Sequence, residues 1–196
     1  MGLRRICVFC GSSPGARVEY RSAAIALEDA LVDRGLGLVY GGAGVGLMGV
    51  IADHVLARSG EVIGVIPESL IELEVVHNGL PDLRRVSSMH ERKALMAELA
   101  DGFIALPGGF GTLDEFSEMI TWGQLGLHQK PSGLLNIAGY YDDLLRFLDH
   151  AVAEGFIKPK HRSSVLIASD PDQLLDQFVQ HEPPRSQKWI DRVDKP

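Results

Sequence analysis

Short apolar runs alternate with amphipathic stretches along most of this chain, and each run ends in a turn rich in glycine, serine or proline. Short apolar runs bounded by such residues are typical of buried strands. The stretches between them place apolar residues at helical spacing, as Ala23, Leu27, Ala30 and Leu31 do within 19–34. Strands that alternate with helices form right-handed βαβ units. We therefore expect an α/β fold with a mostly parallel sheet and helices on both faces.

The same pattern locates the individual elements. Strands are predicted at 5–10, 36–40, 61–66, 83–87, 102–106, 131–137 and 164–168, and helices at 19–34, 47–58, 88–100, 112–126, 140–154 and 171–180. The segment 68–82 has no regular period and is expected to cross the surface. With 196 residues, 45% of them hydrophobic, the chain can build one sizeable core. We expect one domain over 1–181, followed by a polar tail over 182–196.

Composition and charge restrict the partners of the protein. The net charge of −7 disfavours non-specific binding to nucleic acid or to an anionic membrane, because both would be repelled. The chain starts MGLRR and runs directly into ICVF, which lacks the apolar region and cleavage site of a secretion signal. No apolar run approaches the roughly 18 residues of a membrane span. Two cysteines also form no disulfide framework, so a soluble cytoplasmic protein is predicted.

The stretch PGGFGTLDE at 107–115 joins a predicted strand to a predicted helix. Its glycines, Gly108, Gly109 and Gly111, can adopt positive φ and let backbone N–H groups approach an anion. The helix that follows adds unpaired N–H donors and a partial positive charge, and Thr112 is placed to cap it. Glycine in a tight turn can also serve geometry alone. We interpret the stretch as a candidate phosphate cradle.

Three further turns follow predicted strands, namely Gly11-Ser12, Gly41-Gly42 and Pro67-Glu68. The carboxyl ends of parallel strands meet at one edge of the sheet, and open α/β sheets bind their ligands at that edge. The sequence thus predicts a crevice of glycine-rich loops around the cradle. Gly11, Ser12 and Gly42 are candidate binding residues in it.

Residues 44–49 spell GxGxxG between a predicted strand and a predicted helix, which is the dinucleotide-binding fingerprint. That fingerprint requires an acidic residue about 20 positions later, near the end of the next strand. Glu61 begins that strand instead, and Glu68 lies beyond Pro67. We interpret the stretch as a tight turn that lines a nucleotide site, with an NAD(P)-dependent oxidoreductase as the alternative.

The predicted helix at 88–100 carries two adjacent cations near its start. Ser88 and Glu91 have the spacing of a capping box, which accounts for Glu91. Arg92 and Lys93 follow at the end of the first turn, where positive charge opposes the helix dipole. An anion that meets both side chains and the helix N–H groups would relieve this conflict. Two solvated side chains are the alternative.

Glu115 has two compatible interpretations. Thr112 and Glu115 have the T-x-x-E spacing of a capping box. The same position places a carboxylate one helical turn from the cradle, where the dipole favours its ionised form. There it could stabilise positive charge that develops on a sugar ring, or activate water.

Several other chemistries lack their minimum residues. The sequence contains no HExxH and no Cys/His cluster, so no metal site is expected, and we do not expect a serine hydrolase. Cys7 and Cys10 spell CxxC, but on a strand they point to opposite faces, so we expect buried structural cysteines. Among the seven histidines only His90 lies near the proposed site.

The segments SMHERKALM and LPGGFGTLDEF, preceded by FCGSS and YGGAGVGLMG, resemble the LOG (Lonely Guy) family of cytokinin riboside 5'-monophosphate phosphoribohydrolases over residues 5–180. The resemblance implies a Rossmann-like fold without a redox cofactor, and a homodimer with sites near the interface. It also implies hydrolysis of the N-glycosidic bond of an adenosine-type 5'-monophosphate to free base and ribose 5-phosphate. Whether the substrate is AMP or an N6-prenylated ribotide is left open.

Matched by motif, Arg92 and Glu115 correspond to the catalytic pair of the family. The resemblance further implies that substrate is bound by Lys93, Gly108, Gly109, Gly111 and Thr112 and, through weaker matches, by Glu74 and Thr121. A nucleotide-binding protein without turnover is a second alternative. Proteins of the LOG family have often been labelled lysine decarboxylases, an activity that would require a Schiff-base lysine and a pyridoxal phosphate pocket. Lys93 suits anion pairing better, and we expect no cofactor.

Overall fold

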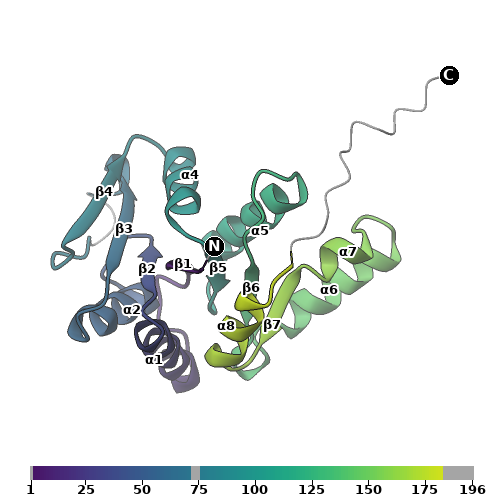
Figure 1. The fold of residues 1–196 in the computed structure, drawn as a ribbon, viewed down its shortest axis with the longest axis horizontal. Coiled ribbons are helices and arrows are strands. Elements are labelled where there is room, and N and C mark those ends of the chain that lie inside the picture. The colour runs from purple at the N-terminus through teal and green to yellow at the C-terminus, as the bar shows by residue number, and fades with distance from the viewer. Residues whose placement is uncertain (1, 72–75, 183–196) are drawn as a thin grey trace.

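A computed structural model describes residues 2–71 and 76–182 and contains a seven-stranded parallel sheet between two layers of helices (Figure 1). Glu74 and the predicted tail from residue 183 onward lie outside the described residues. The strands are β1 (Arg5–Phe9), β2 (Gly37–Tyr40), β3 (Val62–Pro67), β4 (Asp82–Val86), β5 (Gly102–Ala105), β6 (Ser132–Leu135) and β7 (Val165–Ala168). The predicted α/β class with a parallel sheet is confirmed.

The strand order is β4-β3-β2-β1-β5-β6-β7, and every neighbouring pair is parallel. The chain first builds outward from β1 to β4 and then returns to place β5 on the other side of β1. This reversal is a Rossmann-like arrangement. It creates a topological switch point between β1 and β5, where open α/β sheets bind their ligands at the carboxyl edge.

Helices cover both faces of the sheet. They are α1 (Val18–Asp33), α2 (Gly46–Ala57), α3 (Glu68–Ile71), α4 (Met89–Leu99), α5 (Phe110–Gln124), α6 (Asp142–Ala153), α7 (Pro159–Arg162) and α8 (Pro171–Val179), with a short 3-10 turn, η1 (Ile137–Gly139). One core joins the sheet to α1, α2 and α8, and a second joins it to α4, α5 and α6. None of the helices in the described residues has both the length and the apolar character to cross a membrane.

The two cysteines lie in the cores on opposite faces of the sheet, as predicted. Cys7 packs in the core beneath α4 and α5, and Cys10 packs in the core beneath α1 and α2. Burial raises the pKa of both thiols well above the ordinary value. They are therefore structural residues on opposite faces of the sheet.

Three predicted details are wrong. α5 begins at Phe110, with Gly109 at the N-cap position, so Thr112 lies inside the helix and does not cap it. The strand expected at 131–137 ends at Leu135, because Ala138 and Gly139 adopt positive φ and turn the chain. Val179 follows Leu175 by four residues in the predicted helix 171–180, a spacing that predicts an inward position, but it is 71% exposed.

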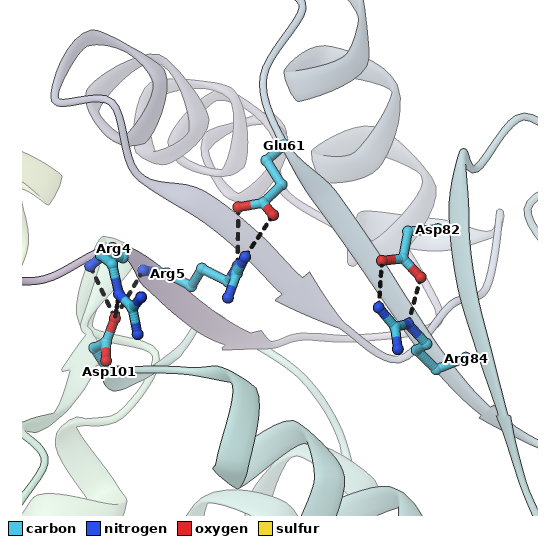
Figure 2. A network of polar contacts seen from close by, with 6 residues as sticks. All are labelled: Arg4, Arg5, Glu61, Asp82, Arg84 and Asp101. Atoms are coloured by element: carbon cyan, nitrogen blue, oxygen red, sulfur yellow. Dashed lines mark hydrogen bonds and ion pairs between the residues drawn. The ribbon is translucent and has the colours of Figure 1, made fainter.

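The amino edge of the sheet is held by ion pairs (Figure 2). Arg5 at the start of β1 forms a two-pronged hydrogen bond with Glu61, at 2.9 and 2.8 Å, and the carboxylate of Asp101 accepts the backbone N–H of Arg5 at 3.1 Å. Glu61 is therefore committed to the edge opposite the glycine-rich loops. It cannot be the ribose-binding acid that the GxGxxG fingerprint requires.

Candidate active site

The turn between β5 and α5 presents backbone N–H groups to the carboxyl edge. Gly109 is the N-cap of α5 and receives no side-chain cap, and the first N–H groups of any α-helix have no partner within the helix. Such donors, together with the positive end of the helix dipole, are suited to binding an anion. Among the residues described, none of the turn's three glycines has a positive φ.

Gly108 is required for space instead. A Cβ on Gly108 would lie 2.1 Å from the Oγ1 of Thr112, whose side chain is 3% exposed. A Cβ on Gly109 or Gly111 would meet no protein atom within 4 Å. Bare backbone at Gly109 and Gly111 therefore faces open space at the helix start, as a phosphate cradle needs.

A cavity of about 270 Å³ lies beside the cradle, at the switch point between β1 and β5. The turns at 11–15 and 107–109 line it together with Tyr20, Leu47 and Tyr140. Gly11 joins the two turns, because its N–H donates to the carbonyl of Pro107 at 3.1 Å. The exposed Ser12 belongs to the same wall, so these predicted binding residues are brought together with the cradle.

Arg92 is buried where β2 and β3 end. Its Nε donates to the carbonyl of Val65 at 3.1 Å and its Nη2 to that of Gly41, also at 3.1 Å. The side chain is 7% exposed, so the guanidinium is fixed in position by two strands. A Cβ on Gly41 would lie 2.1 Å from Nη2, which shows why this position requires glycine.

Glu115 of α5 faces this guanidinium, with its Oε1 3.9 Å from Nη1 of Arg92 and its side chain 15% exposed. The capping explanation for Glu115 is wrong, because the N-cap is Gly109 and the residue three positions after it is Thr112. Glu115 lies six residues after the cap, about 9 Å along the axis at 1.5 Å per residue. A mostly buried carboxylate and a fixed guanidinium thus meet close to the cradle.

The other predicted capping box is half formed. Ser88 Oγ accepts the N–H of Glu91 at 3.2 Å, as expected for the N-cap of α4. The Glu91 carboxylate, however, accepts the N–H and the hydroxyl of Ser87, at 2.8 and 2.6 Å, and these bonds lower its pKa. Glu91 is exposed and serves to start α4, so Arg92 emerges from a well-anchored first turn.

Lys93 is turned toward α5. Its Nζ lies 2.8 Å from a carboxylate oxygen of Glu118 and 3.1 Å from one of Asp114, and its side chain is 8% exposed. Burial opposes the charged form, but hydrogen bonds to Glu118 and Asp114 outweigh it, so the pKa of Lys93 is raised. The anions that meet Lys93 here are carboxylates of this chain. Its role in substrate binding stays a prediction.

The glycines at 41–49 have packing roles. Gly42 has a φ of +81°, and its carbonyl accepts the N–H of His77 at 3.1 Å. Gly46 has a φ of +59°, and a Cβ there would come within 2.2 Å of the backbone of Ser12. A Cβ on Gly49 would lie 2.5 Å from the carbonyl of Gly44. These contacts explain why glycines occur at these positions of the GxGxxG stretch, and they bring the start of α2 against the turn that follows β1.

Comparison with known proteins identifies the family. Residues 48–178 match the family described as "Possible lysine decarboxylase". The cytokinin riboside 5'-monophosphate phosphoribohydrolase LOG7 of Arabidopsis thaliana is 51% identical over 180 residues, which cover 92% of this chain and 83% of that protein. The enzyme of the same description, LOG, from Oryza sativa subsp. japonica is also 51% identical, over 92% of this chain and 74% of its own.

The chain belongs to the LOG family.

Solved structures share the fold of this LOG family chain at lower identity. The molybdenum cofactor binding protein of Rippkaea orientalis matches with a TM-score of 0.66 and 24% identity, over 90% of this chain and 95% of its own. The molybdenum cofactor carrier protein of Chlamydomonas reinhardtii matches with a TM-score of 0.67 and 18% identity, over 91% and 99%. These neighbours support the Rossmann-like architecture.

Thr121, a predicted binding residue of this LOG family chain, does not lie at the cradle. Thr121 lies on α5 beyond Glu115, where its hydroxyl donates to the carbonyl of Ser117 at 2.8 Å and it lines an apolar cavity of about 240 Å³ against α6. Glu74 lies outside the described residues. His90 is exposed at the start of α4, and no contact with the described residues assigns it a function.

Sequence reasoning missed the turn between β6 and α6 of this LOG family chain. Tyr140 and Tyr141 both donate hydrogen bonds to carbonyls of the β5–α5 segment. In the sequence, Tyr140 and Tyr141 stand out only as the first residues of the predicted helix 140–154. Both tyrosines follow a predicted strand. Because the carboxyl ends of parallel strands meet at one edge of the sheet, the sequence could have placed these tyrosines near the other loops.

Proposed function

We propose that this protein hydrolyses the N-glycosidic bond of adenosine-type 5'-monophosphates, releasing the free base and ribose 5-phosphate. The observation that carries this is the meeting of Arg92 and Glu115, 3.9 Å apart, beside an uncapped helix start with bare glycine backbone. Relatives at 51% identity described as cytokinin riboside 5'-monophosphate phosphoribohydrolases support the same reaction. The substrate class therefore includes AMP and N6-prenylated ribotides.

Binding begins at the phosphate. The N–H groups of Gly109, Gly111 and Thr112 at the start of α5 receive the 5'-phosphate, which the helix dipole also favours. The ribose then extends along α5 toward Glu115, whose side chain leans back toward the helix start. Phosphate anchoring fixes the position of the sugar relative to the carboxylate, so most of the orientation is set by the fold.

The chemical step breaks the bond between the sugar C1' and the base nitrogen, and a water oxygen forms the new bond to C1'. Positive charge develops on the sugar ring as the base leaves. The Glu115 carboxylate stabilises this charge or takes the proton from the attacking water. The departing base nitrogen gains a proton, so the elements of water are divided between the ribose 5-phosphate and the free base. Arg92 is held by the carbonyls of Val65 and Gly41, and its Nη1 beside Glu115 donates to phosphate or ribose oxygens.

Lysine decarboxylation is poorly supported by the same geometry. A Schiff-base lysine must lose its proton near neutral pH and is activated by a lowered pKa. The pKa of Lys93 is raised by its two carboxylate partners, and its Nζ is held against α5. Lys93 stabilises the packing of α4 on α5, and through it the distance between Arg92 and Glu115.

The assembly completes the proposal. A cytoplasmic homodimer with sites near its interface would account for the exposed apolar residues of α5 and of the segment around α6, among them Leu125, Phe147 and Phe156. Thr121 and the nearby apolar cavity face that same region. No cofactor is required for hydrolysis of this kind.

Product analysis tests the proposal. Purified protein is incubated with AMP, N6-isopentenyl-AMP and adenosine, and free base and ribose 5-phosphate are separated by chromatography. We expect both products from at least one monophosphate and no base from adenosine, which differs from AMP only in lacking the phosphate. Equal turnover of adenosine would contradict the phosphate requirement. Binding of the monophosphates without any turnover would establish the nucleotide-binding alternative.

A further inference from the structure

Two consecutive tyrosines donate hydrogen bonds to backbone carbonyls of the segment that leads into the cradle. The hydroxyl of Tyr140 donates to the carbonyl of Gly108 at 2.5 Å, and the hydroxyl of Tyr141 donates to the carbonyl of Leu106 at 2.6 Å. Tyr141 is 1% exposed, and burial raises its pKa, so it remains a protonated donor. Tyr140 is 42% exposed and lines the cavity at the switch point.

The remaining carbonyls of the turn are bound as well. The carbonyl of Pro107 accepts the N–H of Gly11 at 3.1 Å, and that of Gly109 accepts the N–H of Leu113 at 3.1 Å inside α5. From Leu106 to Gly109, each carbonyl oxygen is thus directed to a donor of the protein. The N–H groups at the start of α5 are left facing the cradle.

This arrangement matters because a carbonyl oxygen is the negative end of the peptide dipole. A carbonyl turned toward a bound phosphate would repel it, whereas an N–H attracts it. Pro107 is held by backbone and Leu106 by a buried side chain. The Gly108 carbonyl, next to the open helix start, depends on a hydroxyl carried by a half-exposed side chain.

The turn after β6 fixes where that hydroxyl lies. Ala138 and Gly139 adopt positive φ, at +51° and +72°, and Asn136 Oδ1 accepts the N–H of Tyr141 at 2.7 Å. The ring of Tyr140 makes edge contacts with Tyr20 and Tyr141, with centroids 5.6 and 5.0 Å apart. The ring is therefore oriented by packing, independently of its hydroxyl.

We propose that Tyr140 is a positioning residue of the phosphate cradle: its hydroxyl holds the Gly108 carbonyl away from the bound 5'-phosphate. This inference rests on the proposed function. Because Tyr140 acts on the phosphate subsite, its loss weakens ligands that carry a phosphate and leaves ligands without one unaffected. The bond-breaking step at Glu115 is not affected once the substrate is bound.

The test removes only the hydroxyl. Tyr140→Phe retains the ring contacts, and binding of ribose 5-phosphate, AMP and adenosine is measured by calorimetry, together with kcat, KM and Tm. The matched control is Tyr40→Phe, because the buried Tyr40 hydroxyl has no hydrogen-bond partner among the described residues. For Tyr140→Phe we expect about 5- to 20-fold weaker binding of ribose 5-phosphate and AMP, a similar rise in KM, and unchanged kcat.

The outcomes separate this inference from the proposed function. Parental protein that binds no ribose 5-phosphate would overturn the cradle itself, and the role of Tyr140 with it. Equal affinity of the parent and Tyr140→Phe for ribose 5-phosphate and AMP would overturn only the role of Tyr140. A variant that loses Tm and weakens adenosine as much as AMP would show a structural role and also contradict the proposal. Selective loss of the phosphate ligands, absent from Tyr40→Phe, would support it.

Discussion

Replacing Arg92 by lysine tests whether the site needs only a positive charge at this position or also the planar guanidinium with its several hydrogen bonds. The guanidinium bonds the carbonyls of Val65 and Gly41 at 3.1 Å each and lies 3.9 Å from Glu115. A lysine ammonium is a single point donor on a flexible chain and cannot hold both strand ends and also face the carboxylate. At least one hydrogen bond to a charged donor is lost, and a buried carbonyl is left without a partner.

The cost follows from these contacts. A hydrogen bond to a charged group contributes about 1.5 to 3 kcal/mol, so Arg92→Lys should lower the free energy of unfolding by that amount. For a protein of this size the loss corresponds to a fall in Tm of about 3 to 12 °C. Displacement of the positive charge from the sugar should lower kcat/KM by about 10²-fold or more.

Thermal melting and steady-state release of free base measure the two effects together. Arg146→Lys is the control, since Arg146 pairs with Asp143 on α6 and its side chain is 77% exposed. We expect the control to match the parent in both assays. Arg92→Lys with parental Tm and parental kcat/KM would refute the reasoning, and Arg92 would be reduced to a general positive charge.

Two further substitutions test the contact between Gly41 and Arg92 and the effect of the buried Glu28 on stability. Gly41→Ala places a methyl group 2.1 Å from Nη2 of Arg92, so we expect kcat/KM to fall at least about 10-fold. The control is Gly123→Ala, whose methyl group would lie 3.3 Å from His128 and should leave activity near the parental value. Equal activity of the two variants would contradict the contact between Gly41 and Arg92. Glu28 is fully buried without a hydrogen-bond partner among the described residues, and burial raises its pKa in the folded state. The folded protein therefore retains a proton that the unfolded chain releases above about pH 4.3, and stability falls by up to about 1.4 kcal/mol per pH unit as pH rises toward the folded pKa. Urea unfolding at pH 5 and pH 8 should show this decline in the parent and a smaller one in Glu28→Gln, and equal declines would exclude Glu28 as the cause.

The fold was predictable because local patterns and topology agree. Apolar runs and helical stripes located the strands and the main helices, and alternation of the two determined a parallel sheet. The short helices α3 and α7 escaped prediction because four residues carry no measurable period. The start of α5 was misplaced because Thr112 is a favoured capping residue, whereas glycine leaves the cap position open for a ligand.

The site was predictable as a set of loops but not as a set of contacts. Strand ends follow from the pattern, so the meeting of the Gly11, Gly41 and Gly108 turns could be inferred from topology. The partners of Lys93 could not, because they depend on how α4 rotates against α5. The burial of Arg92 could not be predicted either, since its acceptors are the backbone carbonyls of Val65 and Gly41, which lie 27 and 51 residues earlier and carry no sequence signal.

The central claim is that Glu115 carries the chemistry of the proposed hydrolysis. Glu115→Gln retains the size of the side chain and its ability to accept a hydrogen bond but removes the negative charge beside Arg92. The measurement is single-turnover hydrolysis of AMP, or of the N6-prenylated ribotide if that is the monophosphate cleaved, by parent and variant, with affinity determined separately by calorimetry. We predict a loss of about 10² to 10⁴ in the rate of the chemical step, with binding changed by no more than about threefold. Cleavage at the parental rate by Glu115→Gln would contradict the account, because the reaction would then need no carboxylate at this position.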